Sequence, residues 1–264
     1  MSLTRFFLED QVIADEATEE FSLALSPDDA KHLRVLRLSP GEHIAVVDAA
    51  SDYFECEITG FSGAQAVVRI ARRLDAPKER ARVTLVQGLA KGDKMDTVIR
   101  HATELGVSSF LPLSGERSIV KLDAKKTSTR LARWRAIAKS AAMQSGQPRI
   151  PDIAAPSTLD AACKLLADVD ALLVCWEEAP ETARLDDAIA RGLDARGVDA
   201  AHARVAVVVG PEGGLSEREV RALLDSNPRS ALVCLGPSIL RTETAGIVAP
   251  ALALYELDRL GERA

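Results

Sequence analysis

The chain of 264 residues has no long apolar run, few aromatic residues and no clustered cysteines. No window approaches the roughly 18 uncharged apolar residues that cross a membrane, so we expect no transmembrane helix and no membrane partner. The N-terminal segment reaches an acidic pair before any apolar run of signal-peptide length, which predicts a cytoplasmic protein. Aromatic residues make up only 4% of the chain, so we expect a core of Ala, Val, Leu and Ile.

The cysteines argue against a structural zinc site and against a disulfide framework. Cys56, Cys163, Cys175 and Cys234 include no CxxC pair, and no Cys/His cluster has the spacing of zinc ligands. Cys175 and Cys234 each end an apolar run, which favours buried free thiols over a disulfide. We therefore predict no metal site.

The net charge is −6, which argues against a protein that binds nucleic acid over most of its surface. One stretch reverses this balance, because residues 117–149 carry nine Lys or Arg against one acid, Asp123. A local patch of this kind can bind RNA in an acidic protein. A charge run is more commonly a solvated face, and both interpretations stay open.

The first 75 or so residues have the pattern of short strands with one helix, which is typical of a small barrel or a curled sheet. The helix is predicted to begin at Ser26-Pro27, where Ser26 suits the N-cap and Pro27 the first helical position. Strands are predicted at residues 5–8, 42–48, 52–59 and 65–70.

From residue 82 onward, apolar strands alternate with helices, which indicates an α/β fold. Continuous apolar runs of strand length are typical of a parallel sheet buried on both faces. Such runs lie at residues 171–176, 204–209 and 231–235, and two further strands are predicted at residues 83–89 and 109–113. The change of pattern predicts two domains, 1–76 and 77–264, and residues 191–202 are predicted to form a loop.

Two loops follow buried strands, where open α/β sheets bind their ligands. Residues 209–216 read Val-Gly-Pro-Glu-Gly-Gly-Leu-Ser, a tight loop in which glycine lets the backbone approach a ligand closely. No Lys-Ser or Lys-Thr follows Gly214, and the loop is not GxGxxG, so a phosphate-binding role is disfavoured. An ordinary strand-to-helix turn remains the alternative.

The second loop, residues 235–246, reads Leu-Gly-Pro-Ser-Ile-Leu-Arg-Thr-Glu-Thr-Ala-Gly. Its threonines and Glu243 are explained if they merely cap the helix that follows, because a carboxylate is favourable at a helix N-terminus. The positive charge of Arg241 is unfavourable at a helix N-terminus, which suggests that this arginine has a functional role.

The two loops resemble the signature segments of the RsmE family, the 16S ribosomal RNA uridine-N3 methyltransferases of the SPOUT superfamily. The resemblance covers nearly the whole chain, and residues 210–215 and 235–245 are its most specific parts. Other matching segments are residues 5–7, 32–37, 91–95, 104–107, 114–118, 144–146 and 149–151, with Trp134. Met143 and Gln147 depart from the family pattern, in a stretch expected to face RNA or a dimer partner.

This resemblance implies a PUA-like β-barrel followed by a SPOUT domain, a trefoil-knotted parallel sheet with helices on both faces that forms a homodimer. It also implies S-adenosylmethionine as cofactor and small-subunit ribosomal RNA or the 30S subunit as partner. The implied cofactor-binding residues are Cys175, Trp176, Gly210, Pro211, Glu212, Gly213, Gly214, Leu235, Gly236, Ile239, Leu240 and Thr244. The expected RNA-binding residues are Arg5, Arg34, Arg37, Arg117, Lys121, Arg130, Arg133 and Arg149.

The expected chemistry begins with N3 of uracil, which is a poor nucleophile until its proton leaves. Arg241 suits the stabilisation of the developing negative charge, since a guanidinium is a fixed cation with several donors. Glu243 or Glu212 is the candidate that takes the proton, directly or through water. Both glutamates can equally hold loop amides or Arg241 itself.

Other functions stay open at this point. A SPOUT enzyme can act on a ribose 2′-hydroxyl or on another base, and no sequence feature shows the target atom. A non-catalytic RNA-binding assembly factor is a second alternative, although such a protein has no need of the glycine loops. A nucleotide-phosphate enzyme is disfavoured by the absence of a lysine after the first loop.

Overall fold

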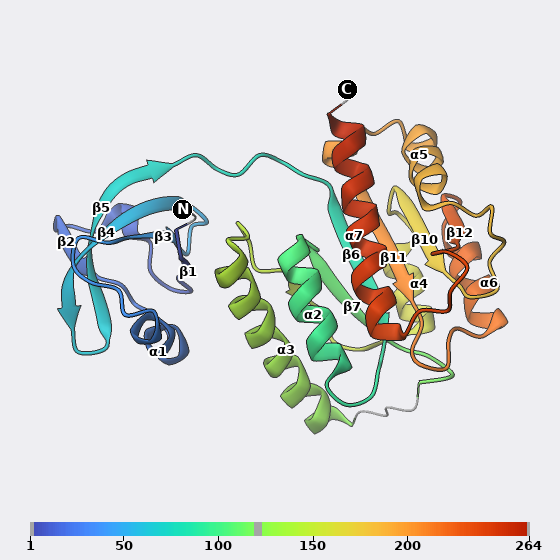
Figure 1. The fold of residues 1–264 in the computed structure, drawn as a ribbon, viewed down its shortest axis with the longest axis horizontal. Coiled ribbons are helices and arrows are strands. Elements are labelled where there is room, and N and C mark those ends of the chain that lie inside the picture. The colour runs from blue at the N-terminus through green and yellow to red at the C-terminus, as the bar shows by residue number, and fades with distance from the viewer. Residues whose placement is uncertain (1–2, 119–122, 263–264) are drawn as a thin grey trace. The chain divides into compact units, whose positions relative to one another are not determined.

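The computed structural model describes residues 3–118 and 123–262. It forms two compact units, each of which has its own sheet (Figure 1). The first unit comprises Met1–Lys78 with Met143–Pro148, and the second comprises Glu79–Ala142 with Arg149–Ala264. Among the described residues, no helix has both the length and the apolar character needed to cross a membrane.

The first unit is a five-stranded sheet in the order β1-β3-β4-β5-β2. β1 and β3 are parallel, and the other pairs are antiparallel. Alternate side chains of β4, including Cys56 and Ile58, are buried and form part of its core. The elements are β1 (Arg5–Phe7), η1 (Ile13–Asp15), β2 (Glu20–Ser22), α1 (Pro27–Val35), β3 (His43–Val47), β4 (Tyr53–Ser62) and β5 (Gln65–Leu74). As predicted, α1 begins after Ser26, whose Oγ accepts a hydrogen bond from the Asp29 N–H.

The second unit contains a sheet in which all described strand pairs are parallel, in the order β12-β10-β11-β6-β7-β8, with β9 also paired to β7. Its strands are β6 (Arg82–Gly88), β7 (Ser109–Ser114), β8 (Asp152–Ile153), β9 (Ser157–Thr158), β10 (Ala171–Cys175), β11 (Arg204–Val209) and β12 (Ser230–Val233). Its helices are α2 (Lys94–Leu105), α3 (Ala124–Ser145, which ends in the first unit), α4 (Leu159–Leu166), α5 (Leu185–Arg196), η2 (Ala200–His202), α6 (Glu217–Ser226) and α7 (Thr242–Gly261).

Helices cover both faces of this parallel sheet, as predicted. Alternate strand residues such as Val207 and Val208 belong to two different apolar clusters. One cluster includes apolar side chains of α2, α3, α5 and α7, and the other includes those of α4 and α6. The period-two alternation of a strand explains this division, because successive side chains point to opposite faces.

The predicted loop at residues 191–202 is wrong. Residues up to Arg196 belong to α5, and η2 follows. Ala188, Ile189 and Leu193 are buried on one side of α5, and Gly197 ends it in the left-handed conformation. Small and charged residues between these positions obscure the apolar stripe that identifies a helix in the sequence. The prediction of a buried thiol is confirmed for Cys175 and wrong for Cys234, which is partly exposed.

The carboxyl ends of β10, β11 and β12 lie level with one another. Cys175 is paired with Val209 on one side and with Val233 on the other, and these residues end their strands. The loops that follow the three strands therefore leave the sheet at the same edge, where parallel α/β sheets place their binding sites.

Candidate active site

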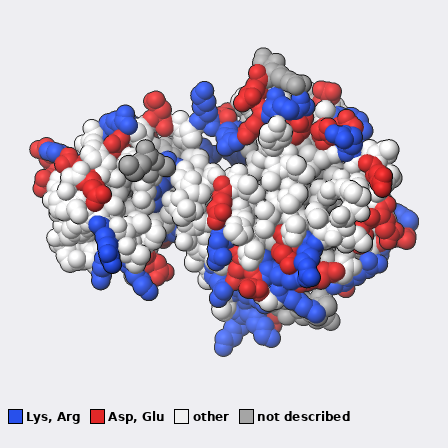
Figure 2. Space-filling view, viewed as in Figure 1, with Lys and Arg blue, Asp and Glu red and all other residues white. Residues whose placement is uncertain are grey.

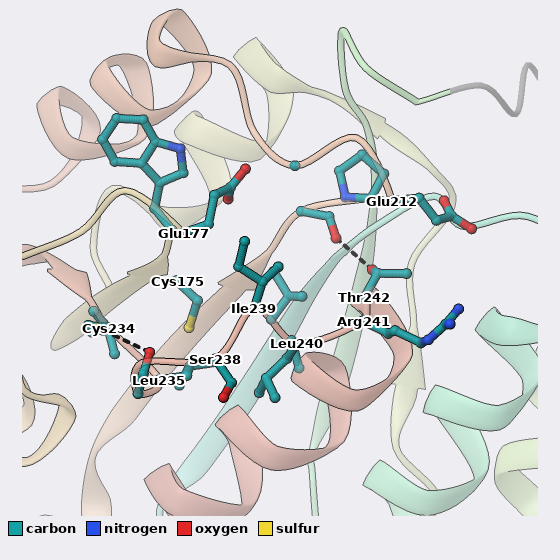
Figure 3. Close-up of a pocket in the computed structure, with 18 of the residues that line it drawn as sticks. Cys175, Glu177, Glu212, Cys234, Leu235, Ser238, Ile239, Leu240, Arg241 and Thr242 are labelled. Carbon is teal, nitrogen blue, oxygen red and sulfur yellow. Dashed lines mark hydrogen bonds between the residues drawn. The ribbon is translucent and has the colours of Figure 1, made fainter. Parts of the chain in front are cut away.

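A pocket of about 380 Å³ lies at this edge of the sheet (Figure 3). Its volume is within the range of small-molecule sites in proteins. The lining comes from the loops after β10, β11 and β12, with contributions from the first turns of α2 and α7. The lining residues are Lys94, Cys175, Trp176, Glu177, Val209, Gly210, Pro211, Glu212, Gly214, Val233, Cys234, Leu235, Gly236, Pro237, Ser238, Ile239, Leu240, Arg241, Thr242 and Ala245.

The loop after β11 requires glycine at two positions. A Cβ on Gly210 would lie 2.9 Å from the carbonyl carbon of Gly214. Gly214 has φ +68°, and a Cβ there would lie 2.2 Å from Oε1 of Glu177. The tight turn is continued by a capping box, in which the Ser216 and Glu219 side chains accept hydrogen bonds from each other's backbone N–H at the start of α6.

A buried hydrogen-bond network joins this loop to the start of α7. The Thr242 hydroxyl donates to the Gly210 carbonyl oxygen at 2.6 Å, and Gln87 Nε2 donates to Thr242 Oγ1 at 2.9 Å. Gln87 is 1% exposed, so its amide is shielded from water. The network fixes the Gly210 turn against α7, and Figure 3 shows the bond from Thr242 as a dashed line.

Three charged groups form a cluster at the edge of the pocket. Lys94 Nζ lies 3.3 Å from Glu212 Oε1 and 3.1 Å from Glu243 Oε2. The Glu212 carboxylate also accepts the backbone N–H of Lys91 at 3.0 Å. One ammonium group therefore links α2, the loop after β11 and the first turn of α7.

These contacts shift the pKa values of all three groups. The contact with Glu243, followed by that with Glu212, raises the pKa of Lys94. The pKa of Glu243 is lowered, first by its own backbone N–H and then by Lys94. Burial raises the pKa of Glu212, but the Lys91 and Glu212 backbone N–H groups and Lys94 outweigh burial, so the net shift is downward. Both carboxylates are therefore ionised at neutral pH and are weaker bases than free glutamate.

Comparison with known families assigns both units. Residues 77–254 match the RNA methyltransferase domain, and residues 25–70 match the RNA methyltransferase PUA domain. The chain is 31% identical to ribosomal RNA small subunit methyltransferase E of Bacillus subtilis, over 98% of each chain. It is 36% identical to the enzyme of the same name from Mycobacterium bovis, over 81% of this chain and 79% of that one.

The chain belongs to the ribosomal RNA small subunit methyltransferase E family. Solved structures agree with this assignment. A small subunit methyltransferase E from Neisseria gonorrhoeae bound to S-adenosylmethionine has a TM-score of 0.76 and 27% identity, and the alignment covers 95% of this chain and 96% of that one. A methyltransferase of Legionella pneumophila in complex with the same cofactor has a TM-score of 0.76 and 28% identity, covering 96% and 97%.

The structure brings together most of the residues that the family resemblance implied for cofactor binding and catalysis. Every predicted cofactor-binding residue lines the pocket except Gly213 and Thr244. Thr242, which was not among the predicted cofactor-binding residues, lines the pocket, and its hydroxyl donates to the Gly210 carbonyl oxygen. The catalytic candidates Arg241 and Glu212 line the pocket, and Glu243 reaches it through Lys94. Sequence reasoning missed Lys94 and Glu177, although Lys94 lies in one of the family's matching segments.

Of the residues predicted to bind RNA, some are hydrogen-bonded to other groups of the protein and others are exposed. Arg117 Nη1 donates to the Gly213 carbonyl oxygen at 3.1 Å, and Arg133 Nε donates to Asp96 Oδ2 at 2.7 Å. Arg5 is partly buried and donates to the Gly146 carbonyl oxygen inside the first unit. Arg34, Arg37 and Arg149 are exposed, Arg130 is partly exposed, and Lys121 lies outside the described residues.

The two departures from the family pattern belong to the first unit. Met143 is 4% exposed, so its side chain offers almost no surface to RNA. Gln147 lies between Gly146 and Pro148, whose carbonyl oxygens accept hydrogen bonds from Arg5 and from the Tyr53 hydroxyl. These contacts hold the segment that carries both departures.

Proposed function

We propose that the protein transfers the methyl group of S-adenosylmethionine to N3 of a uridine in 16S ribosomal RNA. The observation that carries the proposal is the pocket of three loops at the carboxyl edge of the sheet, with Arg241 at its rim. The relatives named for small-subunit ribosomal RNA, and the similar structures bound to S-adenosylmethionine, support the substrate and the cofactor.

The lining of the pocket fits the cofactor. Apolar side chains such as Val209, Val233 and Leu240 suit an adenine ring, and the carboxylate of Glu177 suits the positive charge of the cofactor. The glycines keep the loop after β11 tight, since a side chain at Gly210 would meet the loop itself and one at Gly214 would meet Glu177. When bound, S-adenosylmethionine supplies a methyl group on a positively charged sulfur, which a nucleophile can displace.

Arg241 has the features needed to stabilise the uracil anion. It is exposed at the N-cap of α7, directly before Thr242, which is fixed by the buried network. Loss of the N3 proton leaves negative charge on the two flanking carbonyl oxygens, and a guanidinium can donate to such oxygens. A donor held in place before the reaction stabilises this charge without a cost of reorganisation.

We propose that water accepts the proton that leaves uracil N3. Glu212 and Glu243 are poor acceptors, because the Lys94 ammonium and backbone N–H groups hold their pKa values low. Both carboxylates are therefore assigned to structure at the pocket edge. This assignment replaces the proton-accepting role that the sequence suggested for them.

The RNA surface is proposed to combine residues 1–76, as an RNA-binding domain, with the basic side of α3 in the catalytic domain 77–264. The PUA match at residues 25–70 supports the first part. Figure 2 shows Lys and Arg side chains gathered at the lower edge of the second unit, where α3 begins in Figure 1. Trp134 is buried in the core, which leaves residues such as Lys125 and Arg135 on the exposed side of α3.

RNA binding is expected to weaken steeply with salt, because each phosphate that a Lys or Arg neutralises releases counterions. Replacing Lys125 and Arg130 by alanine should reduce the slope of log affinity against log salt by about 1.5, at about 0.7 to 0.9 for each phosphate that is no longer neutralised. Fluorescence anisotropy with a small-subunit RNA fragment measures this slope. A control with Lys164 and Arg221 replaced, on α4 and α6, should keep the wild-type slope, and an equal reduction in both variants would contradict the assignment.

A homodimer through α7, together with a trefoil knot in the sheet domain, completes the proposal. Membership of the family whose resemblance implied the knot supports it. Tyr255 and Leu252 are 71% and 43% exposed on α7, and both line a hollow beside the loop after β12, on which Ile239 is 86% exposed. Large apolar side chains exposed together are typical of an interaction surface.

Since ribosomal RNA is the proposed substrate, we place the enzyme in the cytoplasm.

Substituting Tyr255 with glutamate is expected to convert the dimer to a monomer, because a charge would be buried in the apolar interface. Sedimentation equilibrium of the purified protein gives the mass directly. Leu165 is 64% exposed on α4, so a Leu165→Glu variant serves as the matched control and should remain dimeric. A monomeric wild-type protein would sink the proposal of a homodimer.

Deletion of the gene tests the function in cells. Nucleoside digests of small-subunit RNA from the deletion strain should lack N3-methyluridine, and a plasmid copy of the wild-type gene should restore it. Loss of a 2′-O-methyl nucleoside or of another methylated base would instead favour a different target atom. An unchanged set of modified nucleosides would favour a non-catalytic assembly factor.

A further inference from the structure

Lys94 occupies an unfavourable place for a cation. It is the first residue of α2, where the helix dipole repels positive charge. Its side chain is 26% exposed and lies between Glu212 and Glu243, whose side chains are 26% and 23% exposed. A lysine that only stabilised α2 would be better placed at the other end of the helix, so its position is explained by the two carboxylates.

Arg241 lines the same pocket as Lys94 and Glu212 but is left out of the cluster of three charges. Its positive charge makes the smallest of the named contributions to the lowered pKa of Glu243. Nevertheless, among residues 3–118 and 123–262, no carboxylate comes within 4.0 Å of the Arg241 guanidinium. In Figure 3 the Arg241 side chain extends away from Cys175 and Cys234, toward the side of the pocket where Glu212 lies.

We propose that Lys94 is a positioning residue that occupies both carboxylates and so keeps the Arg241 guanidinium free for the substrate. An arginine can pair with a carboxylate through two parallel hydrogen bonds. If Lys94 is removed, we therefore expect Arg241 to form such a pair with one of the two carboxylates that Lys94 no longer occupies. In that state the positive charge of Arg241 would be neutralised by Glu243 or Glu212. A neutralised guanidinium stabilises a developing anion less well. This inference rests on the proposed role of Arg241 in methyl transfer.

Lys94→Met removes the charge and keeps most of the chain length. The expected result is a fall in kcat of about 10²-fold, as for the loss of one stabilising donor, with a smaller change in cofactor affinity measured by calorimetry. Lys94→Arg should recover most of the activity, because a guanidinium can still occupy both carboxylates. Lys164→Met is the matched control, since Lys164 is exposed on α4 and does not line the pocket, and its kcat should stay within about twofold of wild type.

A second substitution separates this role from simple support of the fold. If freed carboxylates capture Arg241, then Lys94→Met with Glu243→Gln and Glu212→Gln should be at least about tenfold more active than Lys94→Met alone, because a neutral amide competes poorly for the guanidinium. A merely structural lysine predicts that neutralising the two unpaired carboxylates restores stability and activity together, so the proposal requires the gain in kcat without a matching gain in melting temperature, and a matching gain would count against it. A triple variant no more active than Lys94→Met would overturn the proposal.

A crystal structure of Lys94→Met tests the same point without activity. Arg241 should lie within about 4 Å of Glu243 or Glu212, the distance of an ion pair. An Arg241 that stays apart from both carboxylates would overturn the inference, even if the wild-type enzyme is active. Absence of methyl transfer by the wild-type protein would instead contradict the proposed function, and the crystallographic result would still decide whether Lys94 keeps Arg241 free.

Discussion

Arg241→Ala is expected to lower kcat by about 10²- to 10³-fold while S-adenosylmethionine binding stays measurable, the magnitude seen when one transition-state donor is removed. The reason is that the guanidinium contacts the uracil anion and not the bulk of the cofactor in the proposed arrangement. Arg241→Lys should recover only part of the loss, because a lysine cannot donate in the planar, forked geometry of arginine. Steady-state kinetics and calorimetry measure the two effects separately.

The control for this variant is Arg221→Ala. Arg221 is exposed on α6, and its side chain is not part of the pocket lining. Removing its charge should leave kcat within about twofold of wild type, since isolated surface substitutions have small effects. Normal turnover by Arg241→Ala would refute the role assigned to this arginine, whatever the control shows.

Gly88→Ala is expected to weaken S-adenosylmethionine binding by about 10- to 100-fold, which corresponds to about 1 to 3 kcal/mol of overpacking. Gly88 is the last residue of β6, and a Cβ there would lie 2.3 Å from the backbone nitrogen of Pro211. The atoms in the way are backbone and a proline ring, which cannot rotate aside. The loop after β11 would therefore be pushed out of the shape that lines the pocket.

Gly60→Ala is the matched control for Gly88→Ala. Gly60 also lies within a strand, β4, but a Cβ there would meet no atom within 4 Å. Calorimetry should give a wild-type dissociation constant for this variant. Near-ultraviolet circular dichroism of Gly88→Ala tells a displaced loop from an unfolded chain, and wild-type affinity in a folded Gly88→Ala protein would contradict the role given to the turn.

The local parts of the fold could be predicted from the sequence because their signals are short-range. The start of α1 at Ser26, the end of α2 at Gly106 and the capping box of α6 depend on residues within one helical turn. The apolar runs of the parallel strands are similarly self-contained. The helix α5 was missed because its buried positions are separated by alanine, glycine and charged residues that give little contrast.

The pocket could be predicted only in part, because its loops are local motifs but their connections are not. Lys94 is far from Glu212 and Glu243 in the sequence, and only the fold brings the three together. The choice between Thr242 and Thr244 depends on the direction in which α7 begins, which the spacing of two threonines does not reveal. In the structure it is Thr242 that bonds the Gly210 turn.

Methyl transfer by the purified protein is the decisive test of uridine-N3 methylation. The protein is incubated with isotope-labelled S-adenosylmethionine and small ribosomal subunits from the deletion strain, and the RNA is digested for mass spectrometry. We expect labelled N3-methyluridine at one site, and its loss with Arg241→Ala. Label in another nucleoside, or no transfer together with no cofactor binding, would contradict uridine-N3 methylation by this protein.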